Sequence, residues 1–172
     1  MAIACAGKVI QPVRVARDYI LRMIEQLATM IAALIHRRNA GEIIEAREDL
    51  ENHCVRTIGF TLSEIKNLAP EEVAKILDRS GALRVTRALI LSELLRLDAE
   101  WHEKDRTSEQ LIQNYVHAFC LVADSIDLLS SDEQPHFRAR LATYAEKLGD
   151  VREHPYISER LAKYDISAQA PG

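Results

Sequence analysis

Apolar side chains recur at spacings of three and four residues along most of the chain, which is the spacing of one face of an α-helix. The longest run covers residues 15–38, and runs of the same period cover 42–58, 70–79, 81–104, 107–129, 131–148 and 156–164, with a short helical piece at 62–68. Almost no stretch alternates apolar and polar residues at the period of two that is typical of a strand. The pattern therefore predicts an all-α fold of about six to seven helices in antiparallel hairpins.

Glycine and proline are scarce, with six and five residues, and they stand at the ends of these runs. Four glycines each follow an apolar run, and three prolines each precede one: Gly41, Gly59, Gly81 and Gly149, and Pro70, Pro135 and Pro155. Glycine adopts the left-handed backbone that closes a helix, and proline fits a first helical turn. Thr107 with Gln110, and Ser131 with Gln134, have the spacing of a capping box at a helix start.

Two of the predicted helices are apolar on most of their circumference, namely Leu83 to Leu97 and Leu111 to Leu129. Such helices are buried on all sides, so we expect these two, together with the first helix, to form the core. The helix at 42–58 is much more charged and is expected to lie outside them. Residues 41–78 hold nine acidic and four basic side chains, and residues 107–131 hold three acidic and no basic ones, in a chain of net charge -4.

The length of 172 residues and the apolar fraction of 48% predict one globular domain at residues 14–165, with a flexible arm at 1–13 and a frayed tail at 166–172. Cys5, Cys54 and Cys120 are widely spaced and odd in number, which favours a reducing, cytoplasmic location. The most apolar segment, Leu27 to Ile35, is shorter than the roughly 20 apolar residues of a membrane span.

The first helical hairpin resembles a tetratricopeptide repeat, because Gly41 precedes the small residue Ala46 by five positions. The second hairpin departs from that repeat, with Arg106 and Leu111 at the corresponding positions. The segment Asp18–Leu27 (DYILRMIEQL) is similar to the opening signature of a family of uncharacterised bacterial all-helical proteins. The resemblance extends to Pro70-Glu71-Glu72 and to a tetratricopeptide-like hairpin at Leu83–Leu129. It implies a short helical solenoid or bundle and supplies no catalytic residues.

Candidate chemistry is sparse. His117 and Cys120 lie three residues apart and could share one helix face, but a closed zinc site needs four ligands, so we interpret them as core residues and predict no metal site. Asp98 and His102 lie four apart without a nucleophile or oxyanion donors, and we interpret them as a helix end. We predict no catalytic residue and no cofactor.

The sequence thus favours a non-enzymatic helical module that acts through protein–protein contacts. The first helix could also form a homodimer through an apolar face made by Met23, Leu27, Met30, Ile31 and Leu34.

Two alternatives stay open at this point. One is an enzyme or small-ligand binder with a pocket near Trp101, His102, Tyr115 and His117. The other is a helix-turn-helix at residues 72–97, in which Arg79, Arg84 and Arg87 would contact DNA, although the net charge gives no basic footprint.

Overall fold

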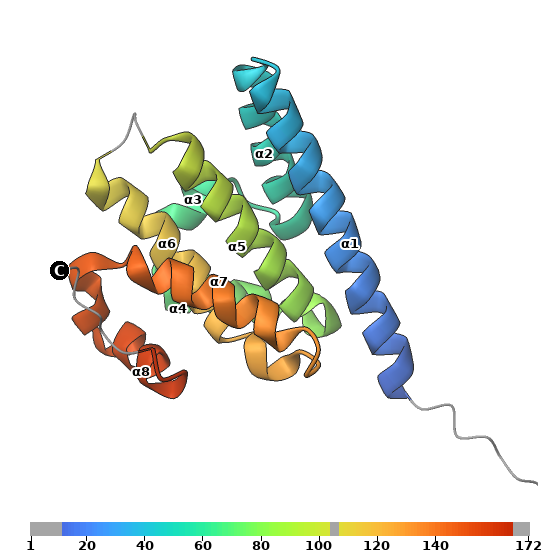
Figure 1. Cartoon of the computed structure of the whole chain (residues 1–172), viewed down its shortest axis with the longest axis vertical. Coiled ribbons are helices and arrows are strands. Elements are labelled where there is room, and N and C mark those ends of the chain that lie inside the picture. Colours follow the sequence, from blue (N-terminus) through green and yellow to red (C-terminus); the bar gives the residue numbers. More distant parts are fainter. Residues whose placement is uncertain (1–11, 104–106, 167–172) are drawn as a thin grey trace, which may run out of the picture.

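The computed structural model describes residues 12–103 and 107–166, without the side chains of residues 12–21, 23, 24 and 108. Within these ranges the chain forms eight α-helices and three short 3-10 turns, and no strand (Figure 1). The predicted all-α fold is therefore confirmed.

The helices follow one another with short connections. In chain order they are α1 (Pro12–Asn39), α2 (Ile43–Ile58), α3 (Leu62–Lys66), α4 (Pro70–Asp78), α5 (Arg84–Trp101), α6 (Ser108–Ala123), α7 (Gln134–Glu146) and α8 (Pro155–Lys163). The 3-10 turns are Gly81–Leu83, Ile126–Leu128 and Gly149–Glu153.

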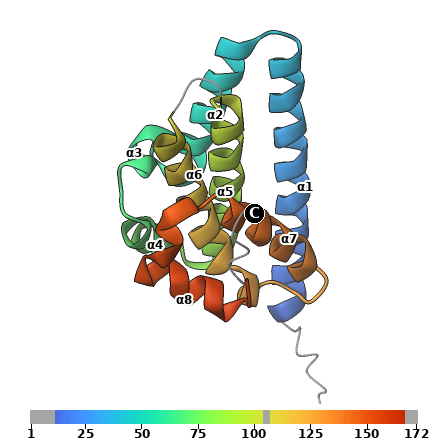
Figure 2. The ribbon, with the colours of Figure 1, turned by 60° about the vertical axis from the view of Figure 1, so that its left-hand side comes forward.

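Helix α5 occupies the centre of the fold and contacts α1, α2, α4 and α6. Every residue from 88 to 99 is buried, which agrees with the expectation for an apolar helix without a polar face. The α1–α2 hairpin lies on one side of α5, and α6 and α7 lie on the other (Figures 1 and 2). Helices α3, α4 and α8 pack against α6, the second buried helix.

Glycine closes the helices as the sequence predicted. Gly41, Gly59, Gly81 and Gly149 all have positive φ angles. At the end of α2, Gly59 has φ 88° and its backbone N–H donates a 2.8 Å hydrogen bond to the Val55 carbonyl. The three prolines lie in first helical turns: Pro70 and Pro155 are the first residues of α4 and α8, and Pro135 is the second residue of α7.

Two predicted helix ends are wrong. The helix predicted over 107–129 ends at Ala123, and the chain turns where the Ser125 hydroxyl donates to the Leu121 carbonyl. The capping box predicted at Ser131 and Gln134 is absent, because Glu133 accepts hydrogen bonds from both the backbone N–H and the hydroxyl of Ser130. The box at Thr107 and Gln110 is confirmed, and Thr61 with Glu64 forms another at the start of α3.

The apolar stripe of α1 is largely used inside the chain. Leu27 and Leu34, two of the five residues of the predicted dimer face, are buried within the hairpin and core of the chain itself. Met30 and Ile31 are half-buried against the same core, and the side chain of Met23 lies outside the described set.

The predicted terminal segments are only partly described. Helix α1 already begins at Pro12, so the last two residues of the predicted arm belong to it, and residues 1–11 lie outside the described ranges. At the other end Ile166 bonds back to Leu161, and the rest of the predicted tail is not described. No helix in the described ranges is both long and apolar enough to cross a membrane.

Candidate functional site

The four residues of the predicted pocket do not converge. Trp101 lies beneath the Arg38 guanidinium of α1, 5.7 Å from its ring centroid, whereas Tyr115 packs on Tyr144 of α7 at 6.2 Å between centroids. His117 is two residues after Tyr115 in α6 and therefore faces nearly the opposite way. Neither of the two cavities described below is lined by any of these residues or by His102, and the predicted pocket stays a prediction.

His117 is a buried core residue, 1% exposed, against the segment that joins α3 to α4. Burial lowers its pKa to about 4, although the backbone carbonyls of Lys66 and Leu68 partly offset this. The pKa of the Cys120 thiol is raised to about 12, mainly by burial. A neutral thiol is a poor metal ligand, and the described residues contain no group of three or more candidate ligands.

A buried carboxylate, Asp98, ties three helices together. Its Oδ2 accepts a 2.8 Å hydrogen bond from Lys66 Nζ of α3 and another of 2.8 Å from Asn114 Nδ2 of α6. Asn114 Nδ2 also donates to the Leu95 carbonyl of α5. His102 Nε2 lies 3.6 Å from Asp98 Oδ1. This network fixes α3 and α6 on the same side of α5 and sets the distance between them.

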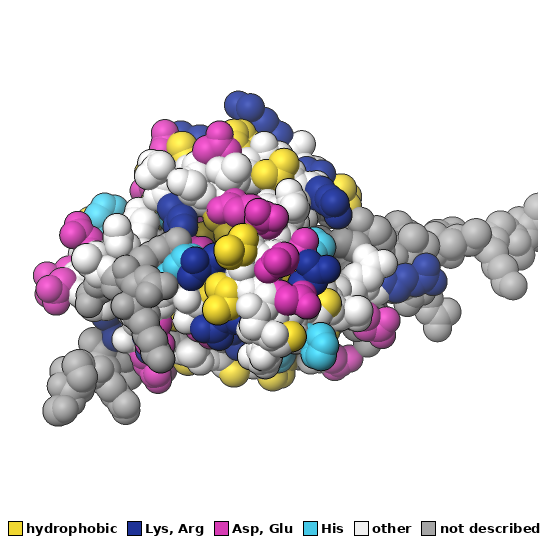
Figure 3. Space-filling model, turned by 90° about the horizontal axis from the view of Figure 1, so that it is seen from above, with side chains coloured by type: hydrophobic (Ala, Val, Ile, Leu, Met, Phe, Trp, Pro, Cys, Tyr) yellow, Lys and Arg dark blue, Asp and Glu magenta, His cyan; other side chains and the backbone are white. Residues whose placement is uncertain are grey.

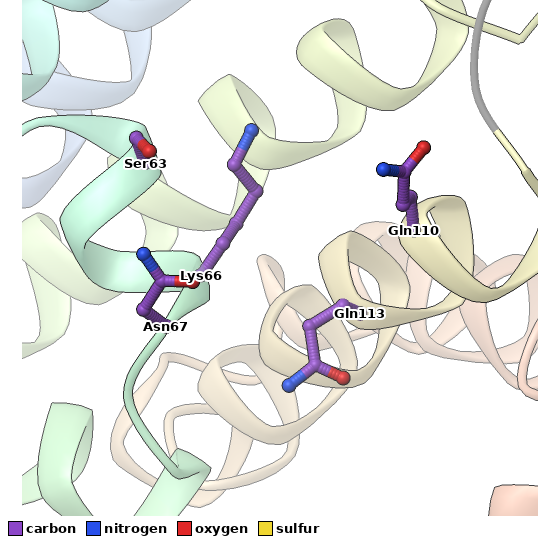
Figure 4. Close-up of a pocket in the computed structure, with 5 residues that line it drawn as sticks. All are labelled: Ser63, Lys66, Asn67, Gln110 and Gln113. Carbon is purple, nitrogen blue, oxygen red and sulfur yellow. The ribbon is translucent and has the colours of Figure 1, made fainter.

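A furrow runs between these two helices. Its first cavity, of about 290 Å³, is lined by Ser63, Lys66 and Asn67 on one wall and by Gln110 and Gln113 on the other (Figure 4). A second cavity of about 320 Å³ adjoins it, because Gln113 lines both. Its other lining residues come from the start of α4, from α6 and from the segment around the start of α8: Ala69, Pro70, Glu71, Val116, Val151, His154, Tyr156 and Ile157. We call the two cavities together the α3/α6 furrow.

The walls of the furrow follow from local sequence. Gln110, Gln113 and Val116 recur every three residues and so share one face of α6. The opposite wall is held by a capping interaction, in which Glu72 accepts a 2.8 Å hydrogen bond from the Ala69 N–H. In the sequence, the amide residues Asn67, Gln110 and Gln113 resemble ordinary surface positions. The one sequence feature that indicates this site is Asn114, a polar residue within an apolar helix.

The end wall formed by α8 is anchored to α6. The Arg160 guanidinium donates hydrogen bonds of 2.9 and 3.1 Å to the two oxygens of Asp124 and lies 3.5 Å from the Tyr156 ring centroid. The Tyr164 hydroxyl donates a 2.6 Å bond to the Ala123 carbonyl. Because both anchors are on α6, the distance across the apolar cavity is set by buried contacts.

Along the furrow, Lys66 has a partner of opposite charge and Glu71 has none among the described residues. The Lys66 ammonium is paired with Asp98, so it contributes little net charge. His154 Nδ1 accepts a 3.3 Å hydrogen bond from the Tyr156 N–H and so caps the start of α8. Glu71 is half-buried in the cavity wall and forms no salt bridge with another described residue.

The helix-turn-helix alternative conflicts with the burial of α5. A recognition helix must be exposed to enter a major groove, whereas residues 88–99 of α5 are all buried. Two of the candidate arginines at its start are engaged locally, Arg84 with Asp78 and Arg87 with the Ser80 hydroxyl. On the face shown in Figure 3, Lys and Arg side chains are interspersed with Asp and Glu and form no basic patch among the described residues.

Comparison with known proteins gives no further assignment, since no family model, curated protein or solved structure matches the chain.

Proposed function

We propose that this chain is a non-enzymatic helical interaction module whose α3/α6 furrow binds an extended segment of a partner protein. The supporting observation is a pair of cavities that share Gln113 as a lining residue, one lined mainly by amide side chains and the other mainly by apolar ones. Peptide segments need both kinds of surface, because their backbone seeks hydrogen-bond partners while some side chains seek burial.

The dimensions of the furrow suit a short extended segment. Gln110 and Val116 are six residues apart on α6, which corresponds to about 9 Å along the helix axis at 1.5 Å per residue. About three residues of an extended chain cover that distance at roughly 3.3 Å each. The amides of Asn67, Gln110 and Gln113 each carry a donor and an acceptor, so they can pair with either backbone group of such a segment.

The lining supports peptide binding better than catalysis. Apart from the paired Lys66, the amide-lined cavity carries only Ser63 and uncharged amides, and a base or nucleophile would need neighbours that activate it. Three further points stay predictions: the tetratricopeptide-like character of the α5–α6 hairpin, the cytoplasmic location, and a homodimer through the first helix (Met23, Leu27, Met30, Ile31 and Leu34). Light scattering tests the dimer, which a monomer at high micromolar concentration would refute.

The proposal is tested by blocking the furrow at its shared residue. Gln113→Trp places a large ring at the position that lines both cavities, whereas Gln26→Trp adds the same ring at an exposed position of α1. Binding to a library of fluorescent, end-blocked octapeptides of random sequence is measured by anisotropy. We expect the native chain and Gln26→Trp to bind the library, and Gln113→Trp to lose binding while keeping its helical circular dichroism spectrum. Equal binding by all three chains, or none by the native chain, would refute the proposal.

A further inference from the structure

We infer that the α3/α6 furrow selects a basic residue of the bound segment, whose aliphatic stem lies in the apolar cavity and whose charged head pairs with Glu71. The inference rests on the proposed function and adds the chemistry of the partner. Its basis is the combination of an unpaired acidic group, apolar walls and an acidic surrounding surface.

Among the described residues that line the furrow, Glu71 is the one carboxylate, and it lacks the cation that several other buried or half-buried carboxylates have. Asp98 is paired with Lys66, Glu93 with Arg96, and Asp124 with Arg160. Glu71 is half-buried beside apolar groups, yet it has no salt bridge to any described residue. A partly desolvated carboxylate without a counter-charge is unfavourable, so a cation supplied from outside gains more here than at an exposed site.

The basic side chains Lys66 and His154 near the furrow have partners other than Glu71. The Lys66 ammonium bonds to Asp98 at 2.8 Å, and His154 Nδ1 accepts the hydrogen bond from the Tyr156 N–H. Glu71 itself stands in the first turn of α4, whose N-terminal end lies at the cavity. The start of α8 also lies at the cavity, but its Tyr156 N–H is taken by His154 and the next N–H, of Ile157, bonds to the His154 carbonyl.

The cavity walls suit the stem of a lysine or arginine. Val116, Val151 and Ile157 provide apolar surface beside Glu71. Long basic side chains bury their methylene groups on such surface and keep the charged head at a polar rim. One face of the Tyr156 ring is already covered by Arg160, so this ring serves as a wall for the stem.

The surrounding charge favours the same partner. The α3–α4 wall belongs to residues 62–78, which hold four acidic and two basic side chains. The α6 wall belongs to residues 108–123, which hold one acidic and no basic side chain. A surface of net negative charge attracts basic segments and raises their association rate, most strongly at low ionic strength.

The test compares end-blocked octapeptide libraries that carry Lys, Arg, norleucine or Glu at one fixed central position, with uncharged residues elsewhere. Norleucine keeps the stem of lysine and lacks the charge. At 0.15 M salt we expect the Lys and Arg libraries to bind the native chain about tenfold more tightly than the norleucine library, as for a partly desolvated ion pair. The Glu library should bind more weakly still.

Two substitutions of Glu71 test whether its carboxylate causes the preference for Lys over norleucine. Glu71→Gln should reduce the Lys-over-norleucine ratio to less than about twofold, and Glu71→Lys should make the Glu library the tighter binder. Glu159→Gln, which removes one exposed acid of α8 away from the cavity, should keep the tenfold ratio. Thermal melting of each variant checks folding.

The possible failures are distinguishable. Equal affinity of the native chain for Lys and norleucine libraries, or an unchanged ratio in Glu71→Gln, would overturn the selection of a basic residue. If Gln113→Trp still abolishes binding of all four libraries in that case, the furrow binds peptides without charge selection. If no library binds, both the proposed function and this inference are wrong.

Discussion

The hydroxyl group of Tyr144 in α7 donates a 3.0 Å hydrogen bond to Glu93 Oε1 in α5, and both side chains are buried. The Glu93 carboxylate also forms a 2.9 Å salt bridge with Arg96, and Arg140 Nε lies 3.3 Å away. Burial and the neighbouring Glu93 both raise the pKa of Tyr144, so its hydroxyl stays protonated and remains a donor. This contact connects α7 to the central helix, although the two residues are 51 positions apart.

Tyr144→Phe removes that donor and keeps the ring. We expect the free energy of unfolding to fall by about 1–2 kcal/mol, because a buried acceptor loses one partner but keeps its cations. Glu93→Ala should cost more, about 3–5 kcal/mol, because it leaves the Arg96 guanidinium buried with only Glu100 as a partner. Urea denaturation followed by circular dichroism measures both losses.

The matched control is Tyr115→Phe, which removes the hydroxyl of the neighbouring ring. Tyr115 packs on Tyr144 but is only half-buried, so we expect a change below about 0.5 kcal/mol. An equal loss in the two Tyr→Phe variants would show that the bond to Glu93 adds no stability of its own.

The sequence could predict the helices because their signals are local. The spacing of apolar residues, the four glycines and Pro70, Pro135 and Pro155 each act within one or two helical turns. The errors arise where a different local contact takes over. Ser130, and not Ser131, pairs with the acid three residues later, and a hydroxyl bond from Ser125 to Leu121 marks the turn after α6.

The furrow could not be predicted in the same way. Lys66 and Gln113 are separated by 47 positions and meet only because Asp98 holds α3 and α6 against α5. Their side chains have no sequence pattern that distinguishes them from solvated residues. The apolar stripe on α1 has a related limit, since the sequence does not show that α2 and α5 contact this helix and that Leu27 and Leu34 are already buried within the chain.

His117 should make stability depend on pH. Its folded-state pKa is about 4 and its ordinary value is 6.5, so between these values the unfolded chain binds more protons than the folded chain. Stability is therefore complete above about pH 6.5 and falls as the pH decreases toward 4, by up to about 3 kcal/mol from this residue. His53, whose pKa burial also lowers, acts in the same direction.

The measurement is the urea midpoint from pH 7 to pH 4.5 in the native chain and in His117→Asn. The variant should lose most of this slope, whatever its stability at pH 7. His36→Asn, at an exposed position of α1, should keep the native slope. A native slope in His117→Asn would show that other groups cause the acid sensitivity.

The pair formed by Lys66 and Asp98 links the stability of the fold to the geometry of the furrow. Lys66→Met leaves Asp98 buried with its Asn114 hydrogen bond and nearby His102, so we expect a loss of about 3 kcal/mol in the free energy of unfolding. Asp98→Asn removes the charge and leaves Lys66 without its anion. In the double variant neither charge remains, so its loss should be smaller than the sum of the two single losses by at least about 1 kcal/mol. Additive losses measured by urea denaturation would mean that the 2.8 Å contact contributes nothing, and that α3 is held against α5 by Leu62 and Ile65 alone.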